Sequence, residues 1–278
     1  MQPFAHPRSQ TPIPMDLLSI SAPDRIWSSD RWLELSHCSV QRPFPVHFHP
    51  EIVVAVIVNG AELVISGGVE QIAETGSIVV FEPEQPHRNV PVGDRGVQYR
   101  GFYLDPTQLL CPDIVRLREH VIHDRDAARR LIELHRALEI VPSSGLVREA
   151  TTAIAGVYLG LPRAAEMEPL REELRRIAAI LRERCQERLP WSELARSVDI
   201  SPAFLARRFA ICFGVPPHTY QVQHRVAQAK RLIRERRPLS AVAIESGFAD
   251  QSHFTHQFAR YVGQTPGRFA AGQKNTRR

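Results

Sequence analysis

The spacing of apolar residues divides the chain into two parts that favour different secondary structure. In the first part, short β-like runs alternate with turn signals, as in EIVVAVIV, AELVIS and SIVVFEP. The pair Asn59-Gly60 separates two of these runs, and Asn-Gly between apolar segments is typical of a tight hairpin. Several short strands at this spacing predict a small all-β barrel or sandwich over residues 23–108.

Beyond residue 109 the apolar period lengthens to that of amphipathic helices. Apolar residues recur at intervals of three and four in two stripes, the first made of Ile114, Leu117 and Val121 and the second of Leu131, Leu134 and Leu138. Residues 109–165 are therefore predicted to form a helical linker. Its second stripe, from Leu131 to Leu138, has two interpretations: it pairs with the same stripe of a second subunit, which makes this the dimerisation region of a homodimer, or it packs on the barrel of its own chain.

Residues 170–272 are predicted to be helical throughout, with two helix–turn–helix patterns. The first pattern covers residues 191–213 and the second covers residues 239–262, and a long helix is predicted between them at 220–236. A stiff connecting helix would fix the separation of two recognition helices, and successive major grooves on one face of B-DNA lie about 34 Å apart. The predicted fold class is two-domain α+β, with an all-β N-terminal domain, a helical linker and an all-α C-terminal domain.

Local signals mark the ends of these helices. Ser201 is a good N-cap, and Pro202 follows it at the first helical position, where a missing N–H costs nothing. Gly247 suits a helix end in the left-handed conformation. The turns of both helix–turn–helix patterns are thereby predicted from single residues.

The outward faces of the second helix in each pattern carry side chains suited to reading DNA. In the first, Ala203, Ala206 and Arg207 lie opposite an apolar side made of Leu205, Phe209, Cys212 and Phe213. An arginine can bind guanine O6 and N7 with two hydrogen bonds, and an alanine methyl can contact thymine. In the second, the polar residues that point away from Phe254, Phe258 and Tyr261 are Ser252, His253, His256 and Arg260.

The same region resembles the AraC/XylS transcription regulators. The match runs from SPAFLARRFAICFGVPPHTYQVQHRVAQAKRLI to VAIESGFADQSHFTHQFARYVGQTPGRF. The resemblance implies a double helix–turn–helix unit that places two recognition helices in adjacent major grooves of promoter DNA, with RNA polymerase as a further partner. The residues that it places toward the bases are Ala203, Ala206, Arg207, Gln251, Ser252, His253 and His256. Arg208, Arg225 and Lys230 are candidates for contact with phosphates.

Charge supports a polyanionic partner for this half of the chain. Of 35 basic and 30 acidic side chains, residues 171–278 hold 20 and 9, which leaves 15 and 21 for the rest. Such asymmetry is expected when one domain meets nucleic acid and the other does not. A solvated surface in an arginine-rich chain is the alternative, because 33 of the 35 cations are arginine.

Other features of the composition indicate a cytoplasmic protein with no membrane partner. The longest aliphatic run, Ile52 to Val58, is far shorter than the roughly 20 residues of a membrane span. Residues 1–22 are rich in proline, which predicts a mobile tail and lacks the apolar stretch of an export signal. The four cysteines lie far apart, as expected for reduced thiols.

A second group of candidate residues lies in the β-rich half. In HFHPE, alternation along a predicted strand would place His47, His49 and Glu51 on one face. Together with the later GSIVVFEPEQPHRN, which contains His87, this resembles the two motifs of the cupin barrel and the sensor domain of AraC-type regulators. In metal-binding cupins a glutamate follows four residues after the second histidine, whereas this chain has Val53 there.

These residues leave two interpretations of the β-rich half open. In the first, no cofactor is expected, and an effector pocket for an unknown small molecule is lined by His47, His49, Glu51 and His87, or the histidines form hydrogen bonds within the barrel. In the second, a divalent ion such as Zn²⁺, Fe²⁺ or Mn²⁺ is held by His47, His49 and His87. The favoured function is a one-component transcriptional regulator without enzyme activity. The alternative is a metal-dependent cupin enzyme fused to a DNA-binding domain, against which stand the missing glutamate and the lack of a catalytic motif.

Overall fold

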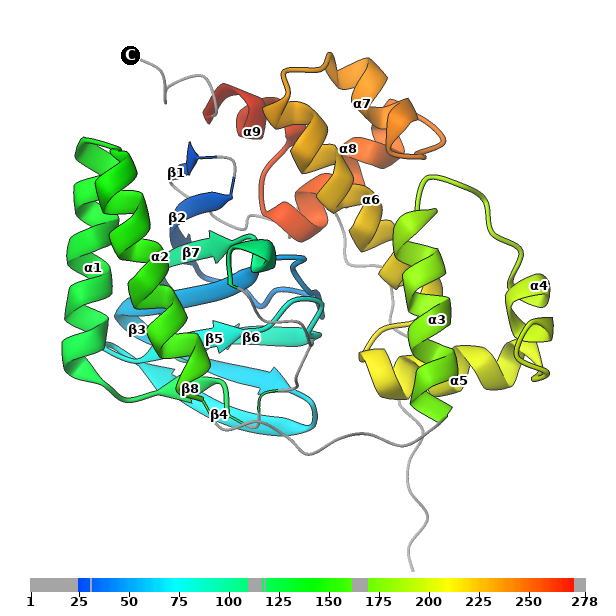
Figure 1. Cartoon of the computed structure of the whole chain (residues 1–278), viewed down its shortest axis with the longest axis horizontal. Coiled ribbons are helices and arrows are strands. Elements are labelled where there is room, and N and C mark those ends of the chain that lie inside the picture. The colour runs from blue at the N-terminus through cyan, green and yellow to red at the C-terminus, as the bar shows by residue number, and fades with distance from the viewer. Residues whose placement is uncertain (1–24, 31, 110–116, 118, 162–169, 273–278) are drawn as a thin grey trace, which may run out of the picture.

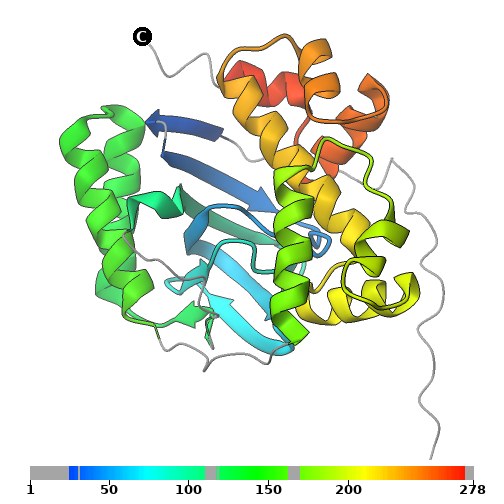
Figure 2. The same ribbon diagram turned by 45° about the vertical axis from the view of Figure 1, so that its right-hand side comes forward.

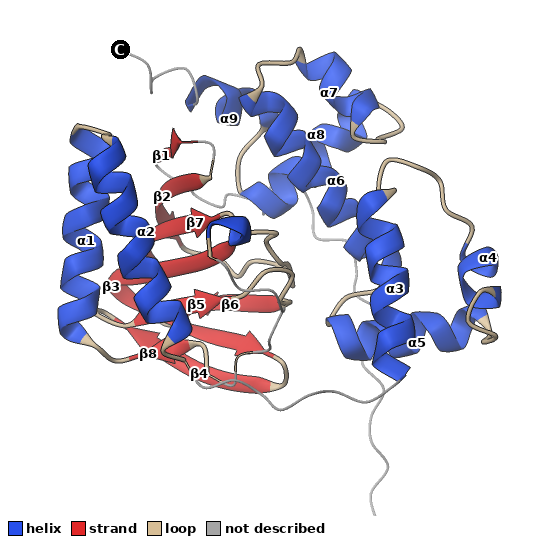
Figure 3. Ribbon diagram, viewed as in Figure 1, coloured by secondary structure: helices blue, strands red, loops and turns tan. Residues whose placement is uncertain are grey.

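The computed structural model describes residues 25–30, 32–109, 117, 119–161 and 170–272. The predicted mobile tail, residues 1–22, lies outside the described residues. Two parts pack side by side in Figure 1: a β domain, residues 25–161, and a helical domain, residues 170–272. Figure 3 shows that the strands all lie on one side of the molecule, in the β domain, in agreement with the predicted α+β fold class.

The β domain is an antiparallel sheet built around one long strand. Its strands are β1 (Arg25–Asp30), β2 (Leu33–Val40), β3 (Ile52–Ser66), β4 (Val69–Glu74), β5 (Ile78–Phe81), β6 (His87–Pro91), β7 (Val97–Leu104) and β8 (Val121–Ile122). The order is β1-β2-β7-β3-β5-β8, and β4 and β6 also pair with β3. The first half of β3 pairs with β5 and β7, whereas its second half pairs with β4 and β6.

The start of β3 is apolar on both faces because it separates two apolar clusters. Ile52, Val54 and Val56 pack on one face with the helices of the β domain. Val53 and Ile57 belong to a second apolar cluster, on the opposite face. Burial on both faces explains why this part of β3 is a run of consecutive apolar residues. In a strand with one exposed face, apolar and polar residues would alternate.

Helices α1 (Arg125–Ile140) and α2 (Ser144–Leu159) cover one face of the sheet, on the side away from the helical domain (Figure 2). The stripe of Leu131, Leu134 and Leu138 is buried against the sheet. Of the two interpretations of this stripe, packing within the chain is therefore the one observed. The helix predicted through Val121 is wrong, because that residue lies in β8 and pairs with Val79 of β5; residues 110–116 lie outside the described part.

The helical domain contains the predicted helices within a few residues. They are α3 (Leu170–Glu183), α4 (Trp191–Arg196), α5 (Pro202–Phe213), α6 (Pro217–Arg234), α7 (Leu239–Glu245), α8 (Gln251–Val262) and α9 (Pro266–Gly272). The Ser201 hydroxyl caps α5 by accepting the Phe204 N–H at 3.2 Å. Gly247, after α7, has φ 78°, and a side chain there would meet the Gln186 backbone at 2.4 Å. Both predictions of helix ends are confirmed.

Helix α6 is the structural centre of the helical domain and its link to the β domain. It begins three residues before the predicted connector and joins the two helix–turn–helix units, α4–α5 and α7–α8. In Figures 1 and 2, α6 also runs beside the open side of the sheet, opposite α1 and α2. Helix α6 therefore lies against the sheet and packs against helices of both units.

Candidate functional site

The exposed face of α5 carries the residues predicted to contact bases. Ala203, Ala206 and Arg207 are all exposed, while Leu205 and Phe209 on the opposite side are completely buried. The three outward residues are thus free to approach a partner along one face. Two apolar side chains that the sequence analysis did not single out, Phe204 and Ile211, are also exposed on this helix.

Helix α8 presents the second predicted set. Gln251 and Ser252 are exposed and His253 and His256 are half-buried, whereas Phe254 and Phe258 are completely buried. Asp250 caps the helix by accepting the His253 N–H at 2.7 Å. The His253 ring lies edge-on to Phe248, with 5.5 Å between ring centroids, which limits how far it can swing toward DNA.

The residues predicted to contact phosphates have other partners in this structure. Arg225 donates from Nε to the Cys185 carbonyl at 2.6 Å and from Nη2 to the Glu187 carbonyl at 3.0 Å. Lys230 is buried, with its ammonium 3.5 Å from Glu34 and 3.7 Å from Glu51 of the β domain. Arg208 is half-buried on α5. Lys230 does not present its ammonium to a phosphate in this conformation, because it is buried and paired with carboxylates. Contact between the half-buried Arg225 and a phosphate stays a prediction.

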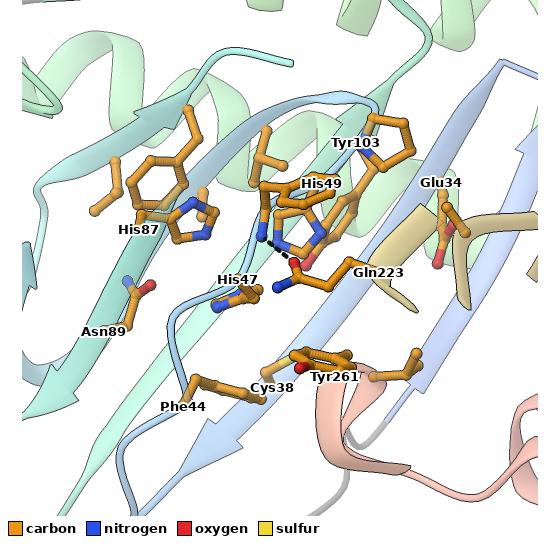
Figure 4. Close-up of a pocket in the computed structure, with 18 of the residues that line it drawn as sticks. Glu34, Cys38, Phe44, His47, His49, His87, Asn89, Tyr103, Gln223 and Tyr261 are labelled. Carbon is orange, nitrogen blue, oxygen red and sulfur yellow. Dashed lines mark hydrogen bonds between the residues drawn. The ribbon is translucent and has the colours of Figure 1, made fainter. Parts of the chain in front are cut away.

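A cavity of about 90 Å³ lies between the β domain and the helical domain. Figure 4 shows His47, His49, His87, Asn89 and Tyr103 gathered on the β side, with Gln223 and Tyr261 facing them. The helical domain contributes to the lining Gln223, Val226, Ala227, Lys230, Tyr261 and Val262. Because α6 and α8 both form part of the wall, the cavity belongs to both domains.

The three predicted histidines meet in this cavity. One nitrogen of each ring in His47, His49 and His87 lies within 4.8 Å of the others. The chain between residues 47 and 51 is not the regular strand predicted: His47 forms an isolated bridge with His87, and β3 begins only at Ile52. The predicted common face with Glu51 is therefore wrong, and Glu51 approaches Lys230 instead.

Burial keeps these histidines neutral. Loss of solvation lowers the pKa of His47 to about 4, although a hydrogen bond to the Pro45 carbonyl opposes this shift. Burial also lowers the pKa of His49 and of His87 well below the ordinary value, with the neighbouring histidines adding to the effect. Burial raises the pKa of Glu62, another residue of the lining, to about 7, while the Asn89 amide that donates to it at 2.8 Å acts in the opposite direction.

Polar contacts hold α6 against the β domain beside the cavity. The Phe48 backbone N–H donates to Gln223 Oε1 at 2.9 Å, drawn as the dashed line in Figure 4. Lys230 and Arg234 both pair with Glu34. Burial lowers the pKa of Arg234 to about 10, which is high enough for the guanidinium to stay charged at neutral pH. The cations of α6 that face the β domain thus find carboxylates there.

A second buried contact joins the domains at Glu84. Its carboxylate accepts from Tyr220 at 2.5 Å and from Arg182 at 2.7 Å. Burial acts to raise the pKa of Glu84, but His224, Tyr220 and Arg182 outweigh it and lower the pKa below its ordinary value. The Phe48 ring packs close by against Tyr220 and His224, in the apolar cluster of the helical domain.

The histidines were predicted from the sequence, whereas the residues that join the two domains beside them were not. Gln223, Phe48 and Glu84 contact residues that lie more than 90 positions away along the chain, so no local pattern marks them. The sequence does distinguish Lys230 in two ways. It is one of very few lysines in a chain whose cations are nearly all arginine, and it comes directly after Ala229, a residue of the apolar stripe of α6.

Two family models match the chain, one on each domain. The AraC-like ligand binding domain matches residues 35–154, and the helix-turn-helix domain matches residues 194–272. A ligand-binding β domain joined to a helix–turn–helix DNA-binding domain defines a transcriptional regulator. The chain belongs to the AraC family of transcriptional regulators, as its helix–turn–helix residues predicted.

Known proteins agree with this assignment. The chain is 25% identical to the uncharacterized HTH-type transcriptional regulator YbfI of Bacillus subtilis over 77% of this chain and 82% of that protein. It is 32% identical to the arabinose operon regulatory protein of Escherichia coli over 29% of this chain and 28% of that protein. The apo crystal structure of a ToxT variant from Vibrio cholerae has the same fold, with a TM-score of 0.57 and 10% identity, covering 87% of this chain and 98% of that chain. Within the described residues, no helix has the length and apolar character needed to cross a membrane.

Proposed function

We propose that this regulator responds to a small effector that occupies the cavity between the β domain and α6, and that occupancy changes how α5 and α8 bind promoter DNA. The observation that supports the proposal is the shared lining of the cavity. A ligand bound there contacts both domains at once, so its binding free energy depends on how they are docked. By linkage, the ligand then shifts the docking equilibrium, and couplings of this kind are worth about 1–3 kcal/mol.

The cavity's size and lining restrict the effector. A volume of about 90 Å³ is smaller than the roughly 150 Å³ of an engineered cavity that binds benzene. In this docked state only a very small ligand fits, and a larger one would have to separate α6 from the sheet. ToxT, which shares the fold, has been solved bound to an unsaturated fatty acid. The histidines, Asn89 and Glu62 in the lining favour a more polar ligand for this chain.

On DNA, α5 and α8 are proposed to enter adjacent major grooves, with Arg207 and Gln251 among the residues that contact base edges. This action on promoter DNA would take place in the cytoplasm. Contact with RNA polymerase and association of two copies are further parts of the proposal. Because the Leu131 stripe is buried within the chain, a second copy would have to use other residues, such as the exposed Ile140 and Val141 at the end of α1.

We propose no catalytic role for the β domain. The proteins with similar sequences are named as regulatory proteins, which supports a regulatory role for this chain. Val53 fills the place of the cupin glutamate with a buried apolar side chain, and Glu51 approaches Lys230.

The test is DNA binding by the full chain with and without ligand. Fluorescence anisotropy on a promoter fragment, identified by footprinting, gives the affinity, and a library of small polar compounds is screened for a change in it. The proposal predicts a shift of about 5- to 150-fold with a true effector. The Gln223→Ala variant, which alters the cavity wall on α6, should change this response, whereas the exposed Arg129→Ala variant on α1 should not. Equal responses of all three proteins to every effector found would contradict the proposal.

A further inference from the structure

The geometry of His47, His49 and His87 is close to that of a metal site. The ring centroids lie 4.9 Å apart for His47 and His49, 4.3 Å for His47 and His87, and 5.3 Å for His49 and His87. Three imidazole nitrogens bound at about 2.0–2.1 Å to one tetrahedral ion would be roughly 3.3 Å apart. The nitrogens here are within 4.8 Å of one another, so modest rotations of the side chains would bring them to that spacing.

Hydrogen bonds behind the cluster leave the ligand nitrogens available. His47 Nδ1 lies 2.9 Å from the Pro45 carbonyl, and His87 Nδ1 lies 2.8 Å from the Gln85 carbonyl. A carbonyl oxygen only accepts, so Nδ1 carries the proton in both rings and Nε2 keeps its lone pair. This arrangement, in which the ring nitrogen away from the metal donates to a carbonyl, is the usual outer shell of a metal-bound histidine.

Further contacts restrict two of the rings to orientations near those observed. The His87 ring stacks on Phe81 with centroids 3.5 Å apart and planes at 9°, and His49 lies edge-on to Tyr103. Preorganised rings lose little conformational freedom when they bind an ion. Lys230, the lysine nearest to the cluster, is paired with Glu34 and Glu51, which offsets part of its repulsion of an added cation.

Three protein ligands leave at least one coordination position open to the cavity. Glu62 and Asn89 line the same space, and no described carboxylate belongs to the three-residue cluster. The open position would take water or a small anionic or neutral donor. Three neutral imidazoles suit divalent ions of the first transition series such as Zn²⁺ or Fe²⁺, and suit Mg²⁺ and Ca²⁺ poorly.

The cluster is also connected to the DNA-binding half by one residue. Phe48 lies between His47 and His49 in the chain, its ring belongs to the apolar cluster of the helical domain, and its backbone N–H is bound by Gln223 of α6. An ion that draws the rings of His47 and His49 together would act on the short backbone segment that carries Phe48. A shift of Phe48 would change how its ring packs against Tyr220 and His224.

We propose that His47, His49 and His87 bind one divalent transition-metal ion and that this ion, through Phe48, sets the docking of the β domain on α6. The regulatory half of this inference rests on the proposed function above, whereas the metal site stands independently of it. The ion is either the signal itself or the anchor to which a small effector binds.

The first experiment titrates metal-free full-length protein with Co²⁺, whose visible absorption bands report its coordination. We expect one strongly bound equivalent with bands of a four- or five-coordinate nitrogen site, displaced by Zn²⁺. His49→Gln should weaken binding by at least about 10-fold. The control His123→Gln removes an exposed histidine that lies outside the cluster and should bind as the wild type does. Equal affinity in all three proteins would show surface binding and overturn the site.

A second measurement avoids the variants, in case His49→Gln fails to fold. X-ray absorption at the zinc edge of the wild-type protein should show three imidazole nitrogens at about 2.0–2.1 Å. A shell dominated by water oxygens, or no bound ion, would overturn the site.

DNA binding then separates the two proposals. If Zn²⁺ changes the affinity of the wild type for its promoter fragment but not that of His49→Gln, the whole inference is supported. If the metal site is absent while another effector still shifts promoter affinity, the metal inference fails and the proposed function stands. If no specific promoter binding occurs with or without metal, the proposed function fails, and the absorption data alone decide the metal site.

Discussion

The contact between Phe48 and the helical domain allows a quantitative prediction for Phe48→Ala. Phe48 belongs to the β domain, yet it is only 6% exposed, and its ring centroid lies 4.9 Å from those of both Tyr220 and His224. The substitution removes the ring and keeps the backbone N–H that donates to Gln223. It therefore isolates the apolar part of the contact between the domains.

The magnitude follows from burial. Burying a phenylalanine side chain stabilises by about 1.5–3 kcal/mol, and truncation in a well-packed core costs about 3–5 kcal/mol because a cavity remains. Part of the space left by Phe48 can close, since it lies where two domains meet. We therefore expect a loss of about 3 kcal/mol in the free energy of unfolding of the helical domain.

The assay is urea unfolding followed by tryptophan fluorescence, in a background where Trp27 and Trp32 are replaced by phenylalanine. The remaining Trp191 begins α4 and reports on the helical domain. The matched control is Phe44→Ala, which removes the same side chain from the same segment but from the apolar cluster of the β domain. Phe48→Ala should move the Trp191 transition to lower urea, and Phe44→Ala should move it much less. Equal midpoints for Phe48→Ala and the parent protein would refute the reasoning.

Three further predictions concern DNA contact, the second contact between the domains and pH. Arg207→Ala should weaken binding to the specific site by about 1–3 kcal/mol and change binding to random DNA little; a uniform loss in anisotropy titrations on both DNAs would mean that Arg207 only contacts phosphate. Glu84→Ala removes the buried carboxylate that accepts from Tyr220 and from Arg182 and should lower the unfolding free energy by roughly 1–3 kcal/mol, an expectation that an unchanged denaturation midpoint would contradict. Burial and the Arg100 guanidinium lower the pKa of His135 from 6.5 to about 3. Its share of the stability, roughly 3–5 kcal/mol, is therefore fully present above pH 6.5 and is lost as the pH falls toward 3. The unfolding free energy, measured at several pH values, should fall less steeply with falling pH for His135→Gln than for the wild type, and an equal pH dependence in both proteins would contradict this.

The parts of the fold that local interactions decide could be predicted from the sequence. The Ser201 cap depends on one hydroxyl, and the end of α7 depends on a glycine that no larger residue could replace. The apolar positions of α5 and α8 follow one helical period, so their buried and exposed faces were both predicted. Each of these signals lies within a few residues of the structure that it determines.

The parts that failed depend on contacts between distant segments. Pro50 and the bridge between His47 and His87 break the strand expected in HFHPE, so Glu51 turns to Lys230. A helix was expected at Val121, but this residue pairs with β5 and supplies hydrogen-bond partners to the backbone at that edge of the sheet. The period of apolar residues along the sequence does not indicate such a pairing. Lys230 was predicted to bind phosphate because its charge was visible, whereas its carboxylate partners, nearly 200 residues earlier, were not.

The central claim is that this chain is a sequence-specific regulator that reads DNA through α5 and α8. The most direct test is a genome-wide footprint of the purified wild type and of Arg207→Ala on fragmented DNA of the source organism, at near-physiological salt. The account predicts sharp sites upstream of a few operons for the wild type and their loss in the variant. Diffuse, salt-sensitive binding that is the same for both proteins, with and without added Zn²⁺ or effector, would contradict it.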